Sequence, residues 1–141
     1  MMSKLLANDP LIAAILAWFL AQLTKVIIAF IRTREVDISK FFSSGGMPSS
    51  HSSTVTALTT AIGIQQGLDS SLFALTVIFA IIVMYDASGV RLAVSKQAKI
   101  LNDFFHGKAK DYKKLNEFVG HTPYQVIIGA LLGIVVAIIY C

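Results

Sequence analysis

Residues 70–90 read SSLFALTVIFAIIVMYDASGV, and no charged residue occurs in this run before Asp86. A helix needs roughly 20 consecutive apolar residues to cross a bilayer, so the run is long enough to span one. Residues 10–31 and 124–140 form two further apolar runs close to that length. The sequence therefore predicts an integral membrane protein.

The composition supports the same class. The chain has 141 residues, of which 55% are hydrophobic and 14% charged, which is outside the range of soluble proteins. A fourth stretch, residues 52–66, is shorter and richer in Ser and Thr, but its place between spanning segments means that it must cross the membrane or return. We therefore expect an all-α bundle of about four transmembrane helices, one domain over residues 1–141, with helices at 10–31, 48–66, 71–93 and 122–140.

Two polar connections, residues 32–47 and 94–120, separate these helices, and we expect the second to be partly helical. They contain most of the cations, namely Arg34, Lys40, Lys96, Lys99, Lys108, Lys110, Lys113 and Lys114, whereas the opposite side has only Lys4. The positive-inside rule predicts that both connections are cytoplasmic and both termini outside, most simply in the plasma membrane. The net charge of +4 then reflects topology and anionic lipid, with the bilayer and not nucleic acid as the partner.

The first apolar run has an alternative interpretation as a secretion signal, because Lys4 precedes it. The run continues to Ile31 and contains Lys25, which a signal core tolerates poorly. The single cysteine, Cys141, excludes a disulfide framework within the chain.

Lys25 and Arg32 are seven residues apart, so they share one face near the end of the first helix. Either side chain could simply extend to the headgroups. An ionisable residue as deep as Lys25 is costly, however, and usually points inward. The next connection ends in SSGGMPSSH, residues 43–51, where free backbone amides and the dipole of the following helix favour an anion. The alternative is a capped helix with an incidental His51.

Two further segments contain candidate residues at the same membrane face. YDASGVR, residues 85–91, contains Arg91, whose fork suits phosphate oxygens, and Asp86, which needs a partner. A structural pair of Asp86 with a cation is the alternative. GHTPYQ, residues 120–125, contains His121 and, four positions later, Gln125; taken alone, this histidine is more often structural. His106 has no such context and is expected to be solvated.

The predicted topology brings these segments to one cavity at headgroup level. The residues expected there are Lys25, Arg32, Arg91, Ser49, Ser50, His51 and His121. Such a site suits a phosphoryl group, because cations neutralise its oxygens, one histidine attacks phosphorus and the other protonates the leaving oxygen. No carboxylate cluster or Cys/His spacing indicates a metal, so we expect no metal site and no cofactor.

These residues resemble the motifs of the type 2 phosphatidic acid phosphatase superfamily, which includes the vanadium haloperoxidases, and in particular its divergent branch. Lys25-x6-Arg32 is similar to K-x6-R-P, with Thr33 in place of Pro, and PSSH at residues 48–51 is similar to P-S-G-H. The string SGGMPSSH, residues 44–51, is the most specific. The third motif, S-R-x5-H-x3-D, is split, with Arg91 as its Arg and His121 with Gln125 as its H-x3-D.

The resemblance implies metal-independent hydrolysis of a phosphomonoester or pyrophosphate on a phospholipid or polyprenyl phosphate, through a phosphohistidine. His121 would be the nucleophile and His51 the general acid. Lys25, Arg32, Arg91 and the amides near Ser49 and Ser50 would hold the phosphate.

The chain departs from the family pattern in ways that leave other functions open. Gln125 replaces the carboxylate that orients the nucleophile, so either catalysis is weakened or Asp86 takes that role. A non-catalytic protein that binds lipid headgroups, as a scaffold or transport partner, is the main alternative, and a small transporter is a weaker one. Four helices instead of the usual six make a homo-oligomer plausible. Bacterial relatives often act at the outer face, whereas the cations predict a site at the cytoplasmic face.

Overall fold

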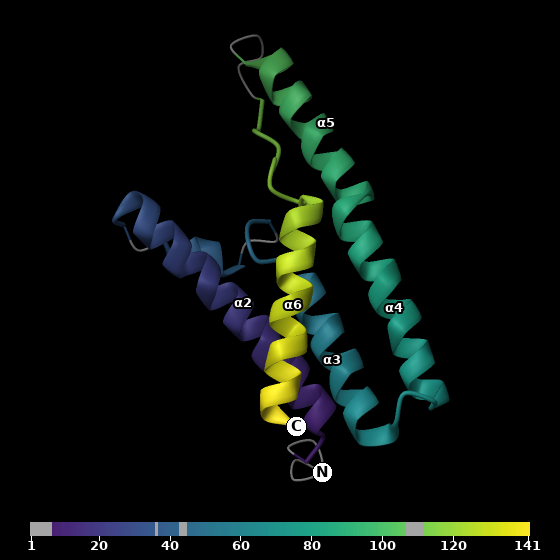
Figure 1. Ribbon diagram of the computed structural model, residues 1–141. Helices are drawn as coiled ribbons and strands as arrows, with labels where there is room; N and C mark the ends of the chain where they lie inside the picture. The colour runs from purple at the N-terminus through teal and green to yellow at the C-terminus, as the bar shows by residue number, and fades with distance from the viewer. Residues whose placement is uncertain (1–6, 36, 43–44, 107–111) are drawn as a thin grey trace.

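The computed structural model describes residues 7–35, 37–42, 45–106 and 112–141, and its regular elements there are all helical. Four helices run in antiparallel succession: α2 (Asp9–Thr33), α3 (Ser50–Gln66), α4 (Ser71–Ser88) and α6 (Pro123–Tyr140) (Figure 1). The 3-10 helix η1 (Ile38–Phe42) folds back beside α2, and α5 (Val90–Phe105) continues the direction of α4 beyond the bundle. Lys4, Ser43, Ser44, Lys108 and Lys110, and the side chain of Lys40, lie outside the described residues. The prediction of an all-α membrane bundle is confirmed.

Lipid-facing and protein-facing helices differ in composition. Three helical segments of the described chain are long and apolar enough to cross a membrane: Asp9–Thr33, Ser71–Phe105 and Pro123–Tyr140. α3 has 17 residues and packs against α2, α4 and α6. The large apolar side chains of α4 instead point outward; Ile78 and Ile82, for example, are 57% and 61% exposed. Because protein surrounds α3, its Ser and Thr residues are tolerated in the middle of a membrane bundle.

Small residues let the central helices approach closely. Ala13 and Ala17 of α2, Ala57 and Ala61 of α3, and Val136 and Ala137 of α6 form the buried core. On α6, a Cβ atom at Gly129 would overlap the carbonyl oxygen of Ser49, and one at Gly133 that of Ser53. The Ser53 hydroxyl donates to the Gly129 carbonyl at 2.9 Å, and the Thr56 hydroxyl to the Ala130 carbonyl at 3.0 Å. These contacts hold α6 against α3.

The predicted polar connection 94–120 is more ordered than the sequence indicates. The helix that begins at Ser71 breaks at Gly89 and continues as α5 to Phe105. Asn102 of α5 holds the returning segment, since it accepts from the Leu115 amide and donates to the Leu115 carbonyl, both at 2.9 Å. The Ser95 hydroxyl accepts from the Gly120 amide, also at 2.9 Å. α5 therefore fixes the chain immediately before His121.

Candidate active site

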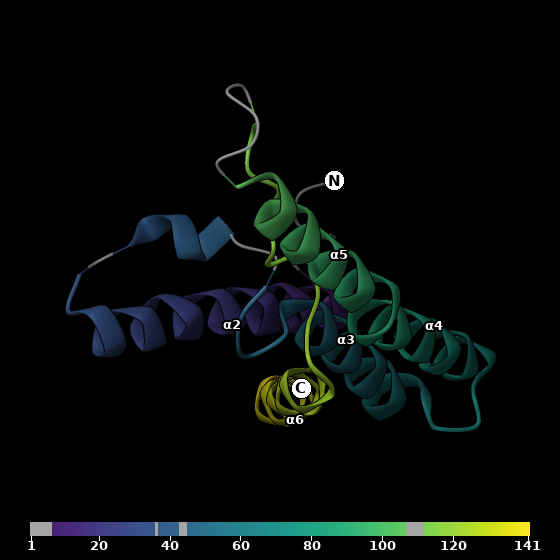
Figure 2. The same cartoon turned by 90° about the horizontal axis from the view of Figure 1, so that it is seen from above.

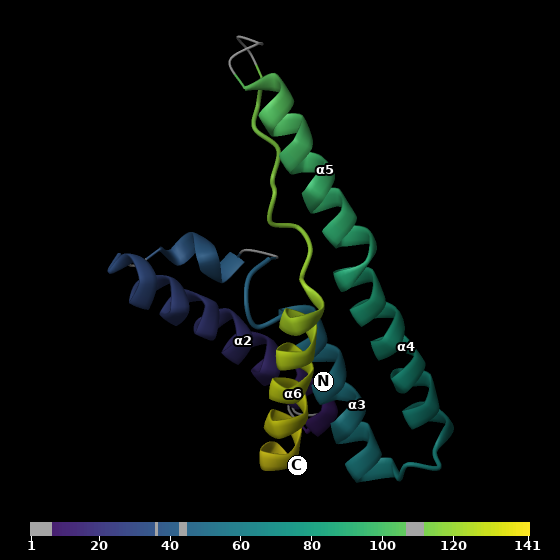
Figure 3. The same cartoon turned by 45° about the horizontal axis from the view of Figure 1, so that its top comes forward.

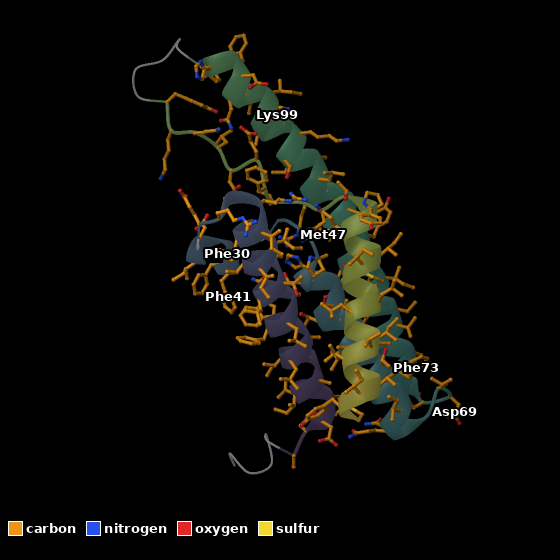
Figure 4. All side chains as sticks on the ribbon, turned by 60° about the vertical axis from the view of Figure 1, so that its left-hand side comes forward. Phe30, Phe41, Met47, Asp69, Phe73 and Lys99 are labelled. Atoms are coloured by element: carbon orange, nitrogen blue, oxygen red, sulfur yellow. The ribbon has the colours of Figure 1, made fainter. Side chains whose placement is uncertain are left out.

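The candidate site lies at the end of the bundle away from both termini. Figure 1 shows the start of α2 and the end of α6 at one end, and in Figure 4 Met47 lies at the other end, opposite Asp69. Four elements contribute to this end, namely the C-terminal half of α2, the start of α3, the junction of α4 with α5, and the start of α6 (Figure 2). The structure thus brings the predicted segments to one end of the bundle.

His51 and His121 lie side by side. Their ring centroids are 5.7 Å apart with an interplanar angle of 66°, an edge-to-face contact. His51 lies in the first turn of α3, while His121 is fully buried and its backbone amide donates to the Ala87 carbonyl at 2.9 Å. The Ser49 amide donates to the Gln125 carbonyl at 3.1 Å, which joins the starts of α3 and α6. Backbone contacts therefore set the spacing of the two imidazoles.

Lys25 points into the bundle and not toward the headgroups. Its side chain is 5% exposed, and its Nζ atom lies 3.4 Å from the Ser50 Oγ atom at the start of α3. Gly46 has a φ of +92°, and a Cβ atom there would lie 3.8 Å from the Lys25 Cδ atom. A glycine tolerates this left-handed backbone beside the lysine side chain. A buried cation beside a helix N-terminus makes this end strongly attractive to anions.

The two arginines occupy more exposed positions. The Arg91 Nε atom lies 2.6 Å from the Asp86 Oδ2 atom, and both side chains are 41% exposed. The positive charges of Arg91 and Lys25 both lie close enough to His51 to interact electrostatically with its imidazole. Arg32 lies on the exposed face at the end of α2, within reach of the cavity described next.

A cavity of about 740 Å³ opens at this end of the bundle, and neither His51 nor His121 lines it. Among the predicted residues, Lys25, Arg32 and Gln125 line it. Its wall is completed by Ile28 and Ala29 of α2, Gly45 to Met47, Asn116 to Phe118, and Thr122 and Tyr124. The cavity therefore combines cationic, hydrogen-bonding and apolar surfaces.

His121 is uncharged at neutral pH. Burial, assisted by the charges of Lys25 and His51, lowers the pKa of His121 to about 4, although nearby Gln125 and the backbone of Gly46 oppose the change. Neither Gln125 nor the Gly46 backbone lies in hydrogen-bond geometry to His121. Both imidazole nitrogens of His121 therefore lack a hydrogen-bond partner among the described residues. A neutral imidazole with a free nitrogen is the form that attacks phosphorus.

The two residues expected to orient His121 are engaged elsewhere. Gln125 closes a capping box, in which its Oε1 atom accepts from the Thr122 amide at 3.0 Å. Asp86 binds Arg91 and makes no hydrogen bond to His121, so a role for Asp86 in orienting His121 stays a prediction. Arg91 lies closer to Asp86 in the chain than His121 does. It is also the stronger partner, because a guanidinium is a permanent cation and the imidazole of His121 is neutral.

Sequence reasoning missed several polar residues near the site. Glu117 lines the cavity and accepts from the Asn102 Nδ2 atom at 2.7 Å, a hydrogen bond that lowers the Glu117 pKa. Gln22, one turn before Lys25, is 5% exposed, and its Oε1 atom lacks a partner among the described residues. Ser95, Ala98 and Asn102 share the buried face of α5, and that spacing was the available signal. Within the described chain, no group of three or more His, Cys, Asp or Glu residues could hold a metal ion.

Comparison with known proteins identifies the family of this chain. Residues 6–136 match the family described as the divergent PAP2 family. The chain belongs to the divergent PAP2 family. It is 46% identical over 151 aligned positions to the uncharacterized membrane protein YuiD of Bacillus subtilis (strain 168), with 96% of each chain covered. No solved structure gives a significant match. The apolar helices and this membrane relative together place this divergent PAP2 protein in a membrane.

Proposed function

We propose that this protein is a membrane-embedded hydrolase that removes phosphate from a lipid phosphate or lipid pyrophosphate without a metal. The observation that carries the proposal is the contact of His51 with the buried, neutral His121 beside buried Lys25. Two imidazoles and a cation are sufficient for phosphoryl transfer through a phosphohistidine, and membership of the divergent PAP2 family supports that chemistry.

The proposed reaction has two steps. In the first, an imidazole nitrogen of His121 attacks the terminal phosphorus, and its bond to the leaving oxygen breaks, which is the lipid oxygen of a monoester or the bridging oxygen of a pyrophosphate. Protonated His51 donates a proton to that leaving oxygen. In the second, water attacks the phosphohistidine while His51 accepts its proton, which releases phosphate and restores His121. Lys25, Arg32 and Arg91, with the amide of Ser50, stabilise the negative charge of the transferring group, whereas the Ser49 amide is held by the Gln125 carbonyl.

Phosphate release from purified, detergent-solubilised protein tests this function. We expect turnover with phosphatidate or with a polyprenyl pyrophosphate, and a fall of about 10²- to 10⁴-fold in a His51→Ala protein, because the leaving oxygen loses its acid. His106→Ala is the matched control, since His106 is exposed on the far end of α5. Equal rates in the His51→Ala protein and the parent would remove His51 from the mechanism.

A second function is favoured by the surroundings of His121. Within the described part of the chain no carboxylate binds its imidazole, and Gln125 acts as a helix cap. A protein that binds lipid headgroups without turnover, as a scaffold or transport partner, is consistent with this arrangement. Saturable binding of phosphatidate or vanadate without phosphate release would favour this second function over the first.

The distribution of cations supports a site at the cytoplasmic face of the plasma membrane. Cys141 is exposed at the end of the bundle away from the site. Labelling of Cys141 therefore shows which side of the membrane lies opposite the site. We expect a membrane-impermeant maleimide to label Cys141 in intact cells. In a Cys141→Ser background, Lys113→Cys should be labelled only after permeabilisation. The reverse pattern would place the site at the outer face.

A further inference from the structure

The cavity changes character between its buried and exposed parts. Lys25 is 5% exposed, Ile28 and Ala29 are half-buried, and Tyr124 is 64% exposed. The surface toward α5 combines the apolar side chains of Leu92 and Phe118 with Ser95, Asn116 and the ionised Glu117. A ligand with a phosphate at Lys25 therefore meets exposed apolar side chains in one direction and a surface that includes a carboxylate in the other.

The apolar part of the cavity lies where α2 and α6 diverge. Near the termini these helices meet through Ala13, Ala17, Val136 and Ala137, whereas toward the site they separate (Figures 1 and 3). Gly129 and Gly133 face α3, so the site end of α6 is held on α3 and not on α2. The opening between α2 and α6 is a result of this packing.

This opening faces the bilayer. Tyr124 at the edge of the opening, and Ile127 and Leu131 on the same face of α6, are 64%, 57% and 54% exposed, as expected for side chains in contact with lipid. Ala29 is the smallest side chain on the α2 side of the opening. Its size leaves room between α2 and Tyr124 that a larger residue would fill.

We infer that the hydrocarbon chain of a bound lipid phosphate leaves the cavity between α2 and α6, across Ile28 and Tyr124, and that Ala29 sets the width of this passage. The inference rests on the proposed function in one respect, because it takes the phosphate group to lie at Lys25. An apolar chain that left past Asn116 would have to cover the ionised carboxylate of Glu117, which costs free energy. Between α2 and α6 it passes directly into lipid.

Photo-cross-linking tests the passage without requiring turnover. The probe is a long-chain phosphatidate with a diazirine in its acyl chain, bound to the full-length protein in lipid nanodiscs, with labelled positions mapped by mass spectrometry. We expect label in residues 25–33 and 122–128 that excess unlabelled phosphatidate removes and phosphatidylcholine does not. Label spread equally over the lipid-facing side of α4, at Leu75 and Ile78, would overturn the inference.

A bulky residue in the passage provides a second test. Ala29→Trp should lower this competable labelling about tenfold, in line with the effect of added volume in an apolar pocket. Ile27→Trp is the matched control, because Ile27 is exposed on the same helix and does not line the cavity. Undiminished labelling in the Ala29→Trp protein would overturn the role of Ala29. The cross-linked positions in the parent protein test the passage itself, whether or not this variant folds.

The two proposals fail in different ways. Labelling at the passage without phosphate release would contradict the hydrolase and leave the passage in place. Phosphate release with label elsewhere would support the hydrolase and contradict the passage.

Discussion

A His121→Gln protein is expected to release phosphate at least about 10³-fold more slowly than the parent, because the attacking atom itself is lost. Glutamine is close in size to histidine and can occupy the fully buried position without leaving a large void. With radiolabelled phosphatidate, the parent should retain an acid-labile label on the protein, as expected for a phosphohistidine. The His121→Gln protein should retain none. Full turnover or full labelling in this variant would show that His121 is not the nucleophile.

The pH dependence of stability tests, without any need for catalysis, whether the His121 imidazole is held neutral in the folded protein. Its pKa is lowered from an ordinary 6.5 to about 4 in the folded protein. Between these values the unfolded chain binds a proton at His121 more readily than the folded chain does. Stability should therefore fall as the pH falls from about 6.5 to about 4. His121→Gln should reduce this slope, and an unchanged slope would indicate that the imidazole is not held neutral.

Lys25→Met is expected to lower kcat/KM for phosphatidate by about 10²- to 10³-fold, the cost of removing one preorganised group from a transition-state charge. Lys25 is 5% exposed and lies beside Ser50 at the start of α3, so water does not replace its charge readily. Phosphate release at a series of phosphatidate concentrations measures the effect. Lys96→Met is the matched control, since Lys96 is exposed on α5.

Thermal unfolding shows whether the loss at Lys25 arises from chemistry or from folding. Methionine has a similar length and carries no charge to bury, so Lys25→Met should unfold at the same temperature as the parent or a higher one. A loss of activity together with a lower unfolding temperature would indicate a structural role. Undiminished kcat/KM would exclude Lys25 from the phosphate site.

Several features of the fold follow from local patterns. The apolar runs predict the helices because a chain in lipid must satisfy its backbone hydrogen bonds internally. The expected 10–31 and 122–140 helices correspond to α2 and α6, at Asp9–Thr33 and Pro123–Tyr140. The break at Gly89 and the extent of α5 were not predicted, because a polar amphipathic helix lacks the long apolar run that marks a spanning helix.

The sequence by itself determined the helices, their order and the gathering of cations and histidines at one end, since apolar length and charge are local properties. Only the tertiary structure decided the partners of the site residues. Gln125 caps α6 and Asp86 binds Arg91, while His121 is left buried and unpaired among the described residues. These pairings depend on how closely α6 packs on α3 and on where α5 holds the segment before His121. The physical reason is that distances of a few ångströms between helices arise from packing of residues far apart in the chain.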